Sequence, residues 1–128
     1  MEKYFAGLWV GESMGVESSP AHMWRVRQNG REIFIHHRWE GETVEHRSQM
    51  WAFVSADGRS FCFERKDEGG RRAYLLDDEH FVIPGWDTND IRGGTGPAFD
   101  VVFSRPGLPE LTSRPLWEAW QASKVEAA

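Results

Sequence analysis

Cysteine is almost absent from this sequence: Cys62 is the only one in 128 residues. A single cysteine cannot form a disulfide within the chain, so the disulfide frameworks of small secreted proteins are excluded. We therefore expect a reducing compartment and a fold that depends on its own hydrophobic core. A chain of this length is sufficient for one such core.

Long apolar runs are also missing. No stretch reaches the length of a membrane-spanning helix. The opening residues, MEKYFAGLWVGE, lack the uncharged apolar stretch of a signal peptide, which predicts a cytoplasmic protein. An excess of positive charge is missing too. The formal net charge of -5 disfavours nucleic acid and anionic membranes as partners.

Aromatic residues are abundant instead, with 7 Trp and 8 Phe. Side chains this large must fill a core, line a pocket or cover an interface. Short stretches of alternating apolar and polar residues are separated by Asn-Gly, Asp-Gly and similar pairs, which are hairpin signals. The predicted strands cover residues 5–14, 21–28, 31–39, 42–55, 59–65, 71–77, 80–84 and 98–105, and a predicted helix covers about 115–124.

Two-residue turns at Asn29-Gly30, Glu40-Gly41 and Asp57-Gly58 would fix how neighbouring strands pair. A turn at DEGG (67–70) would pair Phe63 with Tyr74 and Phe61 with Leu76. This pairing puts apolar side chains on one face of six consecutive strands. The predicted inner face comprises Trp24, Val26, Ile33, Ile35, Val44, Met50, Ala52, Val54, Phe61, Phe63, Tyr74, Leu76, Phe81 and Ile83. Closing such a sheet removes its edges. We therefore predict an all-β fold, an up-and-down antiparallel eight-stranded barrel with a C-terminal helix, as a single domain over residues 1–128.

The first predicted strand contains Gly7-Leu8-Trp9, which resembles the G-x-W motif of the lipocalin and calycin barrels. In that superfamily the tryptophan lies inside the closed end of the barrel, and an arginine from the end of the last strand stacks across it. The resemblance implies that Arg105, which ends the last predicted strand, stacks on Trp9. It also implies a lipocalin-like barrel of the small intracellular kind.

Three histidines point to a site. His22 begins one predicted strand, His37 ends the next, and His46 begins the one after, all with inward parity. They lie toward the barrel end with the long connections 15–20 and 85–97, where function is usually found. The pairing predicts that His22 opposes His37, at roughly 5 Å between Cβ atoms. The predicted ligand-binding residues, with Trp86 on a covering loop, are His22, Trp24, His37, Trp39, His46, Ser48, Tyr74 and Trp86.

Three interpretations of these histidines remain open. They can be structural groups bonded to loop carbonyls or water. They can line a pocket and orient an organic molecule by hydrogen bonds. They can also act as general acids or bases, bind a metal in a three-histidine site, or ligate haem. We expect a protein that binds a small, partly apolar molecule, with an isomerase, cyclase or lyase, or a haem or metal barrel, as the alternatives. The sequence assigns no cofactor, no metal ligand and no catalytic residue.

Some apolar residues have outward parity: Trp51, Phe53, Leu75, Val82 and Val102. Left bare, they would form an exposed apolar patch. The predicted helix carries Leu116, Trp117 and Trp120, which can cover part of that patch. The rest of the patch is available for a homodimer.

Overall fold

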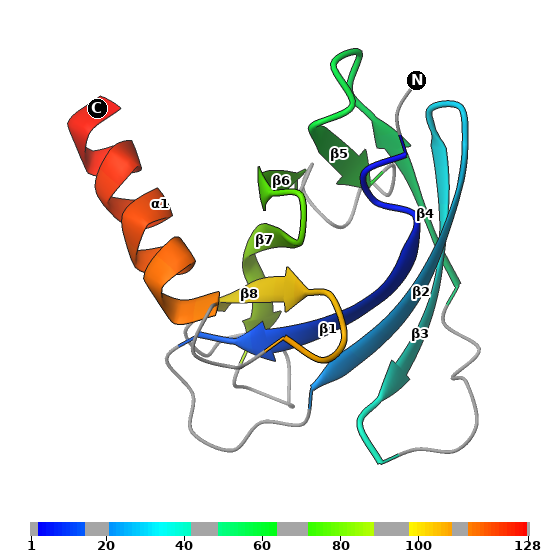
Figure 1. The fold of residues 1–128 in the computed structure, drawn as a ribbon, viewed down its shortest axis with the longest axis horizontal. Helices are drawn as coiled ribbons and strands as arrows, with labels where there is room; N and C mark the ends of the chain where they lie inside the picture. The colour runs from blue at the N-terminus through cyan, green and yellow to red at the C-terminus, as the bar shows by residue number, and fades with distance from the viewer. Residues whose placement is uncertain are drawn as a thin grey trace.

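The computed structural model describes residues 3–14, 21–41, 49–63, 72–88, 98–108 and 113–127. They form eight β-strands followed by one α-helix (Figure 1). The elements are β1 (Gly7–Ser13), β2 (His22–Asn29), β3 (Glu32–Trp39), β4 (Gln49–Val54), β5 (Ser60–Phe63), β6 (Arg72–Asp77), β7 (His80–Thr88), β8 (Ala98–Ser104) and α1 (Ser113–Ala127).

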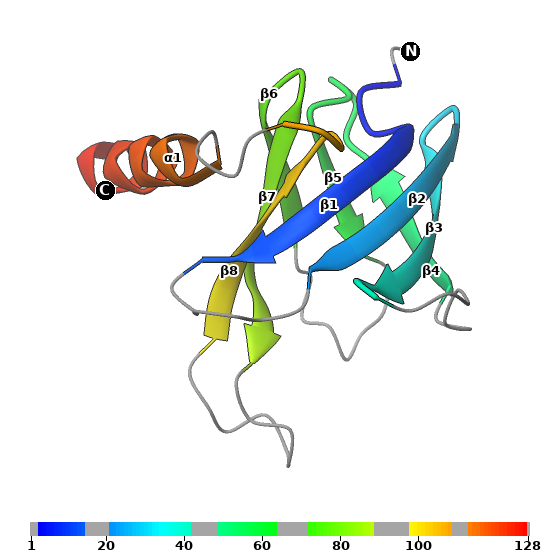
Figure 2. The same cartoon turned by 60° about the horizontal axis from the view of Figure 1, so that its bottom comes forward.

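Each strand pairs antiparallel with the next along the chain, and β8 pairs back with β1 to close the barrel. The predicted all-β, up-and-down eight-stranded barrel with a C-terminal helix is confirmed. The β2–β3 and β6–β7 hairpins lie at the same end as the N-terminal residues, uppermost in Figure 2. Among the described residues, no helix is both long enough and apolar enough to cross a membrane.

Alternation along the strands separates the two faces of the barrel wall. On β2, Trp24 and Val26 are buried while Arg25 and Arg27 are exposed. This period of two is the reason why the inner face can be apolar throughout. The buried core comprises Phe5, Trp9, Trp24, Val26, Ile33, Ile35, Ala52, Val54, Phe61, Phe63, Ala73, Phe81, Ile83, Val101 and Phe103.

One end of the barrel is closed by the N-terminal residues and Arg105. Phe5 is fully buried, and its carbonyl oxygen accepts a hydrogen bond from the Trp9 indole at 2.8 Å. The guanidinium carbon of Arg105 lies 3.7 Å from the centroid of the Trp9 ring, which confirms the predicted stacking. The same guanidinium donates to the carbonyl oxygens of Tyr4 and Leu8. Arg105 therefore ties the end of the last strand to the first strand.

Gly7 leaves room for this contact. Its φ is 111°, where L side chains are strained, and a Cβ there would lie 2.8 Å from Arg105 Nη1. Burial lowers the pKa of Arg105, and the Glu79 carboxylate opposes that shift. Because an arginine remains protonated at neutral pH, the contact with Trp9 is a cation–π interaction.

The helix packs on the outside of the barrel. Val82 of β7 and Val102 of β8 are fully buried, and Trp117 and Trp120 of α1 pack against them. The Trp117 indole donates to Asp100 Oδ2 at 2.9 Å, which fixes the helix to β8. The helix therefore covers part of the outward apolar patch, as the sequence predicted.

The residues that remain in the outward apolar patch differ from the predicted set. Trp51 and Phe53 on β4 stay exposed, at 55% and 38%. Leu75 was predicted to face outward, but it packs against the core inside the barrel. The helix begins at Ser113, slightly earlier than predicted.

The β2–β3 hairpin turns one residue later than predicted. Asn29 still pairs with Glu32, so the two residues between them form the turn. The prediction that His22 opposes His37 is wrong, because His22 opposes Trp39. A shift of two residues leaves every side chain on its original face, so the inner face of both strands is as predicted.

The β3–β4 connection is longer than a two-residue turn at Glu40-Gly41. Ile35 pairs with Met50, where the sequence predicted pairing with His46. Residues 42–48 lie outside the described part of the chain. At the next hairpin the predicted register is confirmed, with Ala52 opposite Phe63.

The predicted strand at 71–77 is present as β6, but the prediction of which of its side chains face inward is wrong. Phe61 pairs with Ala73, whereas the sequence predicted that Phe61 pairs with Leu76, three residues further along. The difference is an odd number of residues, which turns the strand over. Ala73 is therefore buried inside, Tyr74 is 39% exposed, and Leu76 packs in the cluster beneath the helix. An irregularity in the β6–β7 pairing, typical of a β-bulge, accommodates the shift.

Candidate functional site

The inward histidines of β2 and β3 are in hydrogen-bonding contact with each other. His22 Nδ1 lies 3.2 Å from His37 Nε2, and the ring centroids are 5.3 Å apart. Both side chains are buried, with 3% and 8% of the residue exposed. They share one face of the sheet, as predicted, although they are diagonal neighbours and not directly opposed. Two buried imidazoles that share one hydrogen bond form the polar centre of this part of the barrel.

Trp39 packs against both imidazoles. Its ring centroid lies 4.4 Å from that of His22 with the planes tilted by 39°, and 4.9 Å from that of His37 in an edge contact at 84°. Trp39 ends β3 and His22 begins β2. The cluster of His22, His37 and Trp39 therefore lies at the barrel end opposite the closed end, as the sequence predicted.

Trp24 lies next to His37 in the strand pairing and belongs to the buried core of the barrel. It lies directly between Trp9 on β1 and His37 on β3 in the strand pairing. Its ring lies 4.1 Å from that of Phe103 and is 2% exposed. Its indole nitrogen Nε1 is buried and makes no hydrogen bond with any residue that the structure describes. The polar cluster therefore continues directly into an aromatic interior.

Trp86 belongs to β7 and not to a covering loop. The strand continues to Thr88, beyond an irregular stretch of pairing with β8 between Ile83 and Asp87. The Trp86 ring stacks on Phe63 at 4.9 Å and 28°. It also meets Trp24 edge-on at 6.0 Å. Trp86 is thus part of the barrel wall, on the side facing Trp24.

The remaining predicted site residues are not placed in this cluster. Tyr74 lies on the outside, with its ring 6.2 Å from that of Trp120 on the helix, because β6 is turned over. His46 and Ser48 fall outside the described residues. Five of the eight predicted residues are therefore brought together, namely His22, Trp24, His37 and Trp39 from β2 and β3, and Trp86 from β7.

This arrangement is suited to binding an organic molecule through ring contacts and a few hydrogen bonds. Pockets for small molecules combine apolar, aromatic walls with a small number of placed polar groups. An imidazole pair of this kind can also pass a proton in acid–base chemistry. Within the described ranges, no group of three or more His, Cys, Asp and Glu side chains could hold a metal ion.

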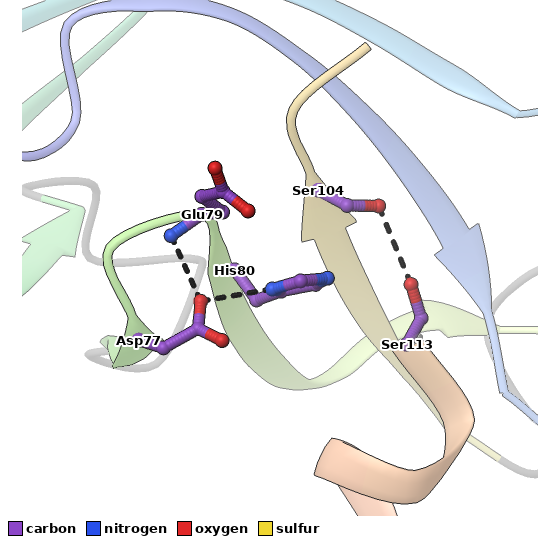
Figure 3. Close-up of polar contacts among 5 residues, drawn as sticks. All are labelled: Asp77, Glu79, His80, Ser104 and Ser113. Atoms are coloured by element: carbon purple, nitrogen blue, oxygen red, sulfur yellow. Dashed lines mark hydrogen bonds and ion pairs between the residues drawn. The ribbon is translucent and has the colours of Figure 1, made fainter. Parts of the chain in front are cut away.

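A second polar cluster was missed by the sequence reasoning (Figure 3). His80 is buried outside the barrel wall, and its Nδ1 lies 2.8 Å from Asp77 Oδ1. Beside it, the hydroxyls of Ser104 and Ser113 lie 3.3 Å apart. An acid, a histidine and a serine suggest a hydrolase, but Ser104 and Ser113 are only 6% and 1% exposed and cannot meet a substrate. The cluster instead joins the start of α1 to β8.

Comparison with known proteins finds no matching family model, curated protein or solved structure. The function is therefore inferred from the geometry of this chain.

Proposed function

We propose that the protein binds a small, partly apolar molecule inside the barrel, at the end where His22, His37 and Trp39 lie. The observation that carries the proposal is the buried His22–His37 contact at 3.2 Å, set in a wall of aromatic rings. The closed opposite end gives such a molecule one side of approach. The calycin-like features, Gly7, Trp9 and the stacked Arg105, support a barrel of the ligand-binding kind.

The polar groups support binding because a core built only for stability does not need them. Burying an imidazole among apolar side chains is unfavourable unless its nitrogens are hydrogen-bonded. Replacing hydrogen-bonded partners with apolar groups of the same shape can be neutral or stabilising. A binding role explains why two histidines lie where Phe or Leu would pack.

A fluorescence titration tests the proposal. The probe is N-phenyl-1-naphthylamine, which becomes bright in apolar surroundings. We expect saturable binding of one probe per chain. His37→Ala should change the dissociation constant at least about threefold, because the probe lies against that wall. His36→Ala is the matched control: it alters the same residue type on the same strand, on the outer face.

Two results would contradict this proposal. One is the absence of saturable binding by the folded protein. The other is an equal response of the His37→Ala and His36→Ala variants, which would place the probe elsewhere on the molecule.

A further inference from the structure

The indole N–H groups of three buried or half-buried tryptophans can be compared. Trp9 donates to the Phe5 carbonyl at 2.8 Å, and Trp117 donates to Asp100 Oδ2 at 2.9 Å. Trp24 is 2% exposed, and its Nε1 has no hydrogen-bond partner in the described part of the chain. The fold thus satisfies the donors of Trp9 and Trp117, which close the barrel and attach the helix, and leaves the donor of Trp24 unused.

An unused buried donor is unusual. More than about 90% of buried polar groups in native proteins are hydrogen-bonded, and an exception calls for an explanation such as a functional role or a bound water or ion. The surroundings of Trp24 offer aromatic rings: Phe103 at 4.1 Å, Trp86 at 6.0 Å, Phe81 at 6.1 Å and Phe63 at 6.4 Å between centroids. None of these rings presents a strong acceptor to an N–H group.

The Trp24 ring is also held in its orientation. It packs against Phe103, which in turn stacks on Phe81 at 4.7 Å and 8°. On its other side Phe103 lies so close to β1 that a Cβ at Gly11 would be 2.5 Å from the ring. Phe103 is thus in contact with Trp24, Phe81 and the Gly11 backbone, so turning the Trp24 N–H toward a strand carbonyl would disturb this packing.

We propose that the Trp24 indole N–H is a hydrogen-bond donor to the bound ligand, and that the ligand is a flat, largely apolar molecule carrying an acceptor such as a ketone oxygen or a ring nitrogen. This inference rests on the proposed function of the barrel interior. The flat shape follows from the aromatic walls, since rings pack best on rings. The acceptor follows from the unused donor. A simple hydrocarbon chain would leave Trp24 unsatisfied.

The test uses two compounds that differ in one atom group. In 2-acetylnaphthalene a ketone oxygen is the acceptor, and in 2-isopropenylnaphthalene a CH₂ group replaces that oxygen. Each compound competes with N-phenyl-1-naphthylamine for the barrel. We expect the wild-type protein to prefer the ketone about tenfold, the effect of one net hydrogen bond. In Trp24→Phe, which keeps a ring and removes the N–H, the preference should fall below about twofold. Trp51→Phe, the same change at an exposed outer residue, should keep it.

A second measurement follows the wild-type protein and uses the Trp24→Phe variant only to assign one resonance. The indole N–H resonances of the ¹⁵N-labelled wild-type protein are followed during addition of each compound. The Trp24 resonance, identified by its absence in Trp24→Phe, should move with the ketone and stay nearly unchanged with the alkene.

The failures of the two proposals are distinguishable. If N-phenyl-1-naphthylamine does not bind at all, the proposed function fails and this inference fails with it. If the probe binds but the wild-type protein does not distinguish the ketone from the alkene, or if Trp24→Phe distinguishes them equally well, the role of Trp24 is wrong and the binding function stands.

Discussion

At the scale of single residues, the two ends of the barrel use aromatic side chains differently. At the closed end the Trp9 N–H is hydrogen-bonded to the Phe5 carbonyl, and Arg105 stacks on the ring. Trp24 is paired with Trp9 on the neighbouring strand, with the histidines beyond it, and its buried indole donor makes no hydrogen bond with a described residue. We infer that the first set stabilises the fold and the second set serves the ligand.

Truncating Trp9 tests the stabilising role. Trp9→Ala should lower the free energy of unfolding by about 3–5 kcal/mol, because it removes a fully buried ring and the cation–π contact of that ring with Arg105. Urea unfolding followed by circular dichroism measures this loss. A loss well below about 1 kcal/mol would mean that the contact between Arg105 and Trp9 does not support the fold.

Truncating His37 separates the binding interpretation from the structural one. If the histidines serve a ligand, His37→Ala should alter probe binding at least about threefold and reduce the free energy of unfolding by less than about 1 kcal/mol. If they are structural, the same change should cost about 1–3 kcal/mol through unpaired neighbours and leave probe binding unchanged. Urea titrations with and without the probe measure both quantities on one sample, with His36→Ala as the control.

At the scale of elements, an error in the predicted strand pairing matters only when it is an odd number of residues. After an even shift, every side chain stays on its predicted face. On β2 and β3 the shift of two left His22, Trp24 and His37 on the inner face. On β6 the shift was odd, and Tyr74 moved to the outside. Turn residues mark where a hairpin bends but do not reveal a β-bulge inside a strand, because the bulge depends on packing between strands.

The position of Trp86 could not be predicted for a related reason. Pro84 and Gly85 on β7 look like the end of a strand in the sequence. In the barrel β7 continues through them, and the N–H of Gly85 donates to the Asp100 carboxylate on β8 at 2.9 Å. A side chain on the neighbouring strand provides a hydrogen bond at this irregular stretch, and sequence patterns for isolated strands do not include such a partner.

The helix is a separate element with its own small core, and its contribution can be measured. Trp117→Ala should lower the free energy of unfolding by about 2–3 kcal/mol, since it uncovers Val82 and Val102 and removes the hydrogen bond to Asp100. Probe binding should be unaffected, because Trp117 lies outside the barrel wall. Glu118→Ala, on the exposed face of the same helix, should change stability by less than about 0.5 kcal/mol.

At the scale of the whole molecule, closure makes the stability of the barrel depend on what it contains. Every strand has two neighbours, so a loss of packing inside is shared by the whole ring of strands. A ligand that binds only the closed barrel should therefore stabilise all of it.

This dependence gives a further measurable expectation. At a free probe concentration about 100 times its dissociation constant, the free energy of unfolding should rise by about 2.7 kcal/mol. Urea unfolding of the wild-type protein with and without N-phenyl-1-naphthylamine measures the rise. A probe that leaves the unfolding midpoint unchanged would bind the unfolded chain equally well, and would not report on the barrel interior.

The contact between His22 Nδ1 and His37 Nε2 links the tautomers of the two rings. A neutral imidazole carries one proton, on either Nδ1 or Nε2. If His22 donates from Nδ1, then His37 must accept at Nε2 and carry its own proton on Nδ1. If His37 donates from Nε2, then His22 must carry its proton on Nε2. When both rings are neutral they are either both Nδ1–H or both Nε2–H, and a change in one requires the same change in the other. In the first arrangement His22 Nε2 is an acceptor and His37 Nδ1 a donor toward their surroundings, and in the second these two roles are exchanged.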